Sequence, residues 1–173
     1  MFYGYIINLQ TVQLKEEYID LYYMLIQMAD EVYPQLSANG KQVKIHAAED
    51  ITITGDSDKL ARAFNNILKN AIVYSNDGST INISAEIHGA NAIIQFENEG
   101  TIPQDKLGSI FEKFYRLDDA RSSATGGAGL GLAIASDIIT VHGGTIEAES
   151  NQTHTLFTIT LPKTPDSQTG TDC

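Results

Sequence analysis

Apolar residues recur at every third or fourth position in three stretches of the chain, and this spacing predicts three long amphipathic helices. The first follows Asp20, a residue type that caps helices, and runs to Asn39-Gly40 with Pro34 in its last turns. The second starts at Gly55-Asp56-Ser57-Asp58, and the third follows a glycine-rich stretch and stops at His142. A shorter helix is predicted between these two. The apolar positions are Leu21, Met24, Leu25, Met28, Val32 and Leu36; Leu60, Phe64, Ile67, Leu68 and Ala71; Leu130, Ile134, Ile138 and Val141; and, in the short helix, Leu107, Ile110, Phe111 and Phe114.

Other stretches alternate apolar and polar residues or carry short apolar runs, which predicts strands. Two of them are separated by Gly89-Ala90-Asn91, which predicts a hairpin. Because helices and paired strands mix without a regular strand–helix–strand repeat, we predict the α+β class. The expected architecture is a two-layer α/β sandwich, with a mixed, mainly antiparallel sheet packed on three helices. The predicted strands cover 41–45, 51–54, 81–87, 93–96, 145–149 and 156–161.

Length and charge limit the possible functions. The 173 residues suit one domain with a proper core, and 11 basic against 22 acidic residues give a net charge of −11. This charge argues against nonspecific binding of nucleic acid or of anionic membranes. The single cysteine, Cys173, allows no internal disulfide and favours a reducing compartment. A phosphate ligand would need local neutralisation by a metal and by the cations ahead of the glycines, which are Lys106, Lys113, Arg116 and Arg121.

The glycine-rich stretch itself, 126–131, is suited to hold phosphates. Four glycines in six residues let the chain turn tightly and present N–H groups to an anion, and the following helix adds the positive end of its dipole. The same pattern also occurs in ordinary flexible loops, and it matches neither a Walker A loop nor a dinucleotide fingerprint. We interpret residues 116–131 as a glycine-hinged lid over a nucleotide.

In the second predicted helix, Asn66 and Asn70 are four residues apart and so lie on one face. Two aligned amides can offer oxygen to Mg²⁺, which takes few protein ligands and completes its shell with phosphate and water. The alternative is that these amides are merely solvated on the polar side of an amphipathic helix. Tyr74 closes the helix and could either stack on a purine or belong to the core.

From about residue 18 to 162 the chain resembles the ATP-binding catalytic domain of sensor histidine kinases, in the superfamily with DNA gyrase, Hsp90 and MutL. The motifs that carry the resemblance are NNILKNA, FEKFYR, GGAGLGLAIA and HGGTIEAES with TITLP, in this order. The whole stretch looks most like the VanS-type kinases of glycopeptide resistance. The resemblance implies the Bergerat-type ATP-binding fold.

Residue by residue, the resemblance implies a Mg²⁺–ATP site. Asn70 would be the Mg²⁺ ligand, Asn66 the amide beside the phosphates and Tyr74 the adenine wall. Arg116 and Arg121 would face the phosphates and, with Asn66, serve catalysis. The remaining implied nucleotide contacts are Gly100, Ile102, Lys113, Thr125, Gly127, Gly129, Leu130, Gly131 and Leu132.

The chain departs from the family pattern in three places. The usual D-x-G-x-G, whose Asp accepts from the adenine amino group, is replaced by Glu97-Asn98-Glu99-Gly100-Thr101; we assign Asn98 to this role, with Glu97 as the rival. Three positions after the metal-binding Asn70, where the family often has a basic residue, this chain has Val73. Four positions before Asn70, where hydrolysing relatives have a glutamate that activates water, this chain has Asn66, and an amide cannot act as a general base. A kinase that sends the γ-phosphate to an external nucleophile is therefore favoured.

The family's phosphoacceptor histidine is missing, since none of the four histidines, His46, His88, His142 and His154, stands in its H-E/D-x-x-x-P context. We expect residues 1–16 to be the end of a removed dimerisation segment, 17–162 the catalytic domain and 163–173 a disordered tail. The acceptor would be a histidine on the dimerisation domain, and the signal would pass to a response regulator. The fragment would be a monomeric cytoplasmic domain of a kinase in the bacterial cell membrane. The alternative is a regulatory module of the same fold that binds nucleotide without transfer.

Overall fold

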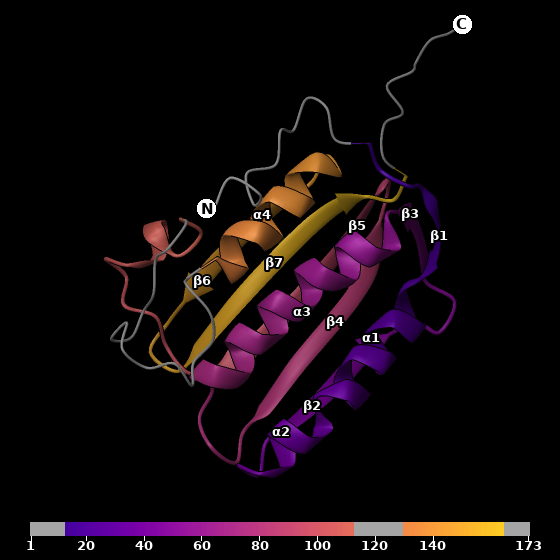
Figure 1. Cartoon of the computed structure of the whole chain (residues 1–173). Coiled ribbons are helices and arrows are strands. Elements are labelled where there is room, and N and C mark those ends of the chain that lie inside the picture. Colours follow the sequence, from indigo (N-terminus) through magenta and orange to yellow (C-terminus); the bar gives the residue numbers. More distant parts are fainter. Residues whose placement is uncertain (1–12, 113–129, 165–173) are drawn as a thin grey trace, which may run out of the picture.

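The computed structural model describes residues 13–112 and 130–164, which form a sheet with the helices α1, α2, α3 and α4 on one face (Figure 1). This two-layer arrangement confirms the predicted α+β sandwich. In chain order the elements are β1 (Glu17–Asp20), α1 (Leu21–Glu31), α2 (Tyr33–Ser37), β2 (Gln42–Ala47), β3 (Thr52–Gly55), α3 (Ser57–Tyr74), β4 (Thr80–His88), β5 (Asn91–Glu99), a 3₁₀ turn (Leu107–Ser109), α4 (Gly131–Val141), β6 (Thr145–Ser150) and β7 (His154–Pro162).

The main sheet has the strand order β2-β4-β5-β7-β6. Among the strands of the described residues, β2 and β4 alone run parallel within this sheet, and the other three neighbouring pairs are antiparallel, as predicted for a mainly antiparallel sheet. β1 and β3 form a separate antiparallel pair. This pair lies beside the end of the sheet where β4 finishes (Figure 1).

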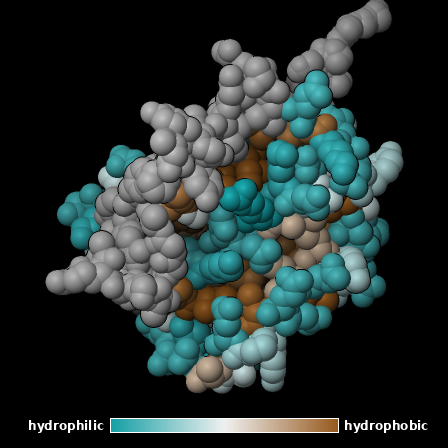
Figure 2. Space-filling model, viewed as in Figure 1, coloured by the Kyte–Doolittle hydropathy of each residue, from teal (hydrophilic) through white to brown (hydrophobic). Residues whose placement is uncertain are grey.

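Alternate residues of the strands point to the helices and make the core. Phe96 of β5 stands opposite Ile83 of β4 and Phe157 of β7, and Phe64 of α3 packs on it with ring centroids 6.3 Å apart. Each such buried ring stabilises the fold by roughly 1.5–3 kcal/mol relative to exposure. The solvent side of the helices is largely hydrophilic, and apolar residues show mainly in strips between the helices (Figure 2).

Two aspartates start helices: Asp20 caps α1 as predicted, and Asp56, one of the four residues predicted to start the second helix, caps α3. Asp20 Oδ1 accepts a hydrogen bond from the N–H of Tyr23 at 3.0 Å, and Asp56 Oδ1 accepts one from the N–H of Lys59 at 3.2 Å. Each bond satisfies a donor in the first turn that has no intrahelical partner. The starts of α1 and α3 are therefore set by local chemistry.

The structure corrects four element predictions. The first helix is two helices, because Pro34 lies at the start of α2 and proline disrupts the turn before it. β5 continues to Glu99 instead of ending at Phe96, and the short helix is only the 3₁₀ turn. Phe114, predicted in that helix, lies outside the described residues. β1 was not predicted.

The C-terminal end of α3 is fastened at two points. The side chain of Lys41, which is 7% exposed, donates from Nζ to the carbonyl of Ile72 at 2.6 Å. Just beyond the helix, the N–H of Asn76 donates to the carbonyl of Glu99 at 2.9 Å. The first bond holds the end of α3 to the start of β2, and the second holds it to the end of β5.

Candidate functional site

One flank of α3 meets the start of α4. The side-chain Nδ2 of Asn66 donates to the carbonyl of Gly131 at 3.0 Å. Asn70 lies one turn further along the same flank and is half-buried. The structure thus brings the predicted amide face of α3 and the last residue of the glycine stretch together on the helix side of the sheet. This juxtaposition is what a shared pocket requires.

Asn98 lies at the end of β5 with a buried side chain. It follows Ile94 and Phe96 on the side of the strand that faces the helices, and it is 3% exposed. No hydrogen bond to its side-chain amide is formed within 13–112 and 130–164. A buried amide without a partner is costly, and such groups in folded proteins are few. The position is therefore suited to receive a polar group of a ligand.

Glu97, the rival of Asn98, belongs to the opposite face of the sheet, because successive residues of a strand point to opposite faces. It pairs with Asn82 on β4 and with Leu156 on β7, and it is half-buried. Its carboxylate therefore lies on the side of β5 that the helices do not cover.

Gly100 and Tyr74 meet where β5 and α3 end. Gly100 has a φ of +146°, and a Cβ at this position would lie 2.5 Å from the carbonyl oxygen of Tyr74 and 3.1 Å from Nδ2 of Asn98. Its own carbonyl accepts from the hydroxyl of Thr155 at 2.8 Å. Only glycine allows the strand end to pass this close to the helix end.

The remaining predicted residues divide into two groups. Ile102 is buried and its N–H donates to Ser150 Oγ at 2.8 Å, while Leu130 and Leu132 are half-buried and pack on the core beside Gly131. Six predicted residues lie outside the described residues: Lys113, Arg116, Arg121, Thr125, Gly127 and Gly129.

A bond between His142 and Asp56 joins α3 and α4 at the end away from Asn66, and sequence reasoning missed it. His142, 2% exposed, accepts at Nε2 from the N–H of Asp56 at 3.0 Å and bonds through Nδ1 to the carbonyl of Ile138 at 2.9 Å. These partners require a neutral ring with the proton on Nδ1. Burial lowers the pKa of His142 below its usual 6.5, although the Ile138 carbonyl opposes the shift. Eighty-six positions separate the partners, so no local signal marks the pair.

Asp56 is the charged member of this junction. Burial alone would raise its pKa, but hydrogen bonds from the N–H groups of Lys15 and Lys59, with the charge of Lys59, hold the pKa below its usual 3.8. The carboxylate therefore stays ionised at neutral pH while it caps α3.

The donors at this site suit a hard cation better than a transition metal. Within the described part of the chain, His, Cys, Asp and Glu form no group of three that could hold a metal. Asn70 offers an amide oxygen, and Mg²⁺ commonly takes one or two protein oxygens and completes its shell with phosphate and water. The residues present thus fit Mg²⁺ bound together with a nucleotide. None of the helices in these ranges is both long and apolar enough to span a membrane.

The fold and the amide face between α3 and α4 define an α+β nucleotide-binding domain. The family model described as "Histidine kinase-, DNA gyrase B-, and HSP90-like ATPase" matches residues 55–165, which is more than half of the chain. The chain belongs to this family of ATP-binding domains, as its motifs predicted.

Within this family, the chain is similar in sequence to sensor proteins and in structure to histidine kinase catalytic domains. The chain is 65% identical over 159 residues to the sensor protein VanS of Enterococcus faecium, covering 92% of this chain and 41% of that protein. It is 38% identical over 157 residues to the sensor protein VanSC of Enterococcus gallinarum, covering 90% of this chain and 43% of that protein. The catalytic domain of the histidine kinase ThkA shares the fold, with a TM-score of 0.78 at 23% identity over 90% of this chain and 99% of that one. The chain spans about two fifths of the curated relatives' length.

We predict that Gly100→Ala destabilises the domain by about 2 kcal/mol or more, because the new Cβ would clash with Tyr74 and the φ is unfavourable for alanine. Urea unfolding of both proteins measures the difference. Gly108→Ala is the matched control, since a Cβ there meets nothing within 4 Å. Equal losses in the two variants would contradict the close approach at Gly100.

We also predict that stability falls as the pH drops below about 6.5. The unfolded chain protonates His142 near its usual pKa of 6.5, whereas the folded chain does so only at lower pH. Between these two pH values the unfolded state binds more protons than the folded state. The contribution of neutral His142 to the free energy of unfolding is therefore fully present above pH 6.5 and declines as the pH falls to the pKa of His142 in the folded chain. Each unit by which folding lowers the pKa of His142 corresponds to a loss of about 1.4 kcal/mol in the free energy of unfolding over this pH range. Unfolding free energies from pH 7.5 to 5 should show this decline, lose it in His142→Gln and keep it in His46→Gln, where the ring is exposed.

Proposed function

We propose that the chain is the catalytic domain of a two-component sensor histidine kinase, which binds Mg²⁺–ATP and sends the γ-phosphate to a histidine on a separate dimerisation domain. The observation that carries this proposal is the meeting of Asn66 with Gly131, one helical turn from Asn70, on the helix side of the sheet. The 65% identity to the sensor protein VanS supports a place in glycopeptide resistance signalling.

Within this proposal Asn70 holds Mg²⁺, which when bound neutralises charge on the phosphates. Asn66 lies beside the phosphates, and its bond to Gly131 couples the amide face of α3 to the start of α4. Tyr74 forms the adenine wall, and Asn98 accepts from the adenine amino group. Further nucleotide contacts are Gly100, Ile102, Leu130, Gly131 and Leu132, with Lys113, Thr125, Gly127 and Gly129 around the lid.

Asn66 also favours transfer over hydrolysis. Its amide cannot take a proton from water at neutral pH, and its Nδ2 already donates to Gly131. Without a general base, catalysis depends on positioning and on charge stabilisation by the metal, Arg116 and Arg121. Attack on the γ-phosphate by an external nucleophile is therefore favoured over attack by water.

The rest of the pathway extends beyond this chain. The acceptor would be a histidine on the dimerisation domain, with residues 1–16 the end of the connecting segment and 163–173 a tail. A response regulator would receive the phosphoryl group; the fold is shared by ThkA, which was solved in complex with the response regulator TrrA. The full-length kinase would lie in the bacterial cell membrane, with this domain, a monomer in isolation, on the cytoplasmic side.

We predict that Asn70→Ala abolishes phosphoryl transfer. The chain is mixed with a purified dimerisation domain of a VanS-type kinase that carries its histidine, together with Mg²⁺ and γ-labelled ATP. The wild type should give acid-labile phosphohistidine, and Asn70→Ala should reduce it at least about 100-fold because a metal ligand is lost. Asn65→Ala, next to Asn66 but off the amide flank, should retain transfer.

The alternative function, a regulatory module, would appear as nucleotide binding with no labelled histidine in any variant. That result would overturn the kinase assignment while leaving the ATP site intact. Loss of transfer in Asn65→Ala equal to that in Asn70→Ala would instead overturn the assignment of the metal ligand.

We further predict that the base contact depends on Asn98 and not on Glu97. Asn98→Leu keeps a similar volume but removes the acceptor, and it should weaken binding of a nonhydrolysable ATP analogue about tenfold, which corresponds to about 1.4 kcal/mol. Glu97→Leu, on the opposite face of β5, should leave the affinity unchanged. Calorimetric titration distinguishes the two, and a larger loss in Glu97→Leu would reverse the assignment.

A further inference from the structure

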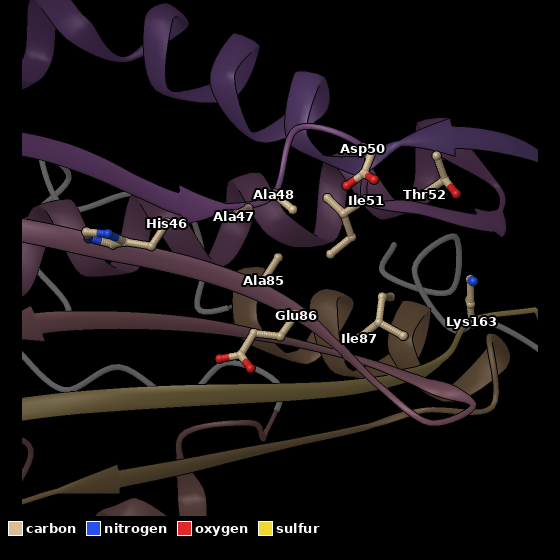
Figure 3. Close-up of a pocket in the computed structure, with 10 residues that line it drawn as sticks. All are labelled: His46, Ala47, Ala48, Asp50, Ile51, Thr52, Ala85, Glu86, Ile87 and Lys163. Carbon is tan, nitrogen blue, oxygen red and sulfur yellow. The ribbon is translucent and has the colours of Figure 1, made fainter.

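A cavity of about 640 Å³ lies at the end of β4 away from the candidate nucleotide site. Its walls come from the end of β2, the segment before β3, the last part of β4, and Lys163 (Figure 3). Neither the family motifs nor the proposed nucleotide contacts include any residue of its lining. The lining consists of His46, Ala47, Ala48, Asp50, Ile51, Thr52, Ala85, Glu86, Ile87 and Lys163.

The cavity occupies the place where β2 would continue beside β4. β2 ends at Ala47, opposite Ala85, whereas β4 runs three residues further to His88. These last residues pair with β5 on one side. On the other side, of these three residues only Ile87 turns its N–H and C=O to the edge, because alternate residues of a strand direct these groups to opposite neighbours, and the register with β2 stops before it at Ala85. An unpaired strand edge of this kind is a template for a further strand.

Side chains on the two faces of this edge differ in character. Ile87 and Ile51 point toward each other across the cavity, and Ala85 points into the same space (Figure 3). Ile87 is 37% exposed, a large fraction for an isoleucine in a strand. The small side chains of Ala47 and Ala48 in the lining leave room for a larger aliphatic group. Glu86 points to the opposite face.

The charges around the cavity favour a basic partner. Two carboxylates, Asp50 and Glu86, stand against one ammonium, Lys163, with Glu86 Oε1 2.8 Å from Nε2 of the exposed His88, and the whole chain carries −11. Charged residues on an edge discourage pairing with neutral apolar strands. An added strand with lysine or arginine facing Glu86 would instead be attracted.

We propose that this edge is a docking site for an extended segment of a partner protein, which adds to β4 as a strand. The segment alternates aliphatic residues, which fill the cavity between Ile51 and Ile87, with basic residues on the Glu86 face. Main-chain hydrogen bonds to the N–H and C=O of Ile87 supply affinity, and the alternating side chains supply specificity. The site goes beyond the proposed kinase function and does not depend on it.

The test uses the capped peptide acetyl-Val-Lys-Val-Lys-Val-amide with the intact chain. Binding is followed by calorimetry and by amide resonances, and we expect shifts confined to Ala47–Thr52 and Ala85–His88. N-methylation of alternate peptide amides should weaken binding at least about tenfold, because the strand bonds are lost. Replacing lysine by glutamate in the peptide should weaken it similarly.

Matched variants separate the site from nonspecific attraction. Ala48→Phe places a large ring in the cavity lining and should weaken binding at least about tenfold, whereas Ala38→Phe, at another exposed alanine, should not. Glu86→Lys should weaken binding, and Glu147→Lys on exposed β6 should not. Affinity for a nonhydrolysable ATP analogue should stay unchanged in all four, which verifies folding.

Several outcomes overturn the proposal. No binding of the peptide at millimolar concentration does so directly. Equal binding of the N-methylated peptide would show that the cavity takes an amphipathic ligand without strand addition. Equal loss in Ala48→Phe and Ala38→Phe, or in Glu86→Lys and Glu147→Lys, would show that the peptide binds elsewhere or only through net charge.

Discussion

The pairing of α3 with α4 is the constraint on which the site depends, and it is fixed at both ends. His142 and Asp56 join the end of α4 to the start of α3, and Asn66 and Gly131 join the two helices near the other end of α4. From Asp56 to Asn66 is ten residues, about 15 Å of helix, and from Gly131 to His142 is eleven, about 16 Å. The two spans match, so both bonds can form without bending either helix.

The same constraint sets the rest of the site. With the start of α3 held at His142, its far end is placed by Lys41, which donates to Ile72, and by Gly100, where the absent Cβ lets β5 approach Tyr74. Lys41 is buried, and its ammonium lies at the C-terminal end of α3, where the helix dipole is negative. The amide flank of α3 and the end of β5 therefore approach each other in a defined arrangement before any ligand binds.

Local signals made most of the elements predictable, and distant partners explain the failures. Asp20 and Asp56 mark helix starts by their own bonds, alternation identifies β4 because one face of it is buried, and the turn residues after β4 identify β5 as its hairpin partner. β1 has four residues and exists through its pairing with β3, thirty-odd positions away. His142 gave no signal because its partner is 86 positions distant. The amide face of α3 was predictable from the spacing of Asn66 and Asn70, but its orientation toward Gly131 depends on tertiary packing.

The amide at position 98 bears on the balance between stability and affinity. A carboxylate there, at 3% exposure, would pay a large desolvation cost whenever the nucleotide was absent. The neutral amide of Asn98 avoids most of that cost, while its oxygen can still accept a hydrogen bond. It gives up the added strength of a charged acceptor, which roughly doubles a hydrogen bond. If Asn98 contacts adenine as proposed, the domain without nucleotide is more stable than it would be with a carboxylate at position 98, but it binds the nucleotide less tightly.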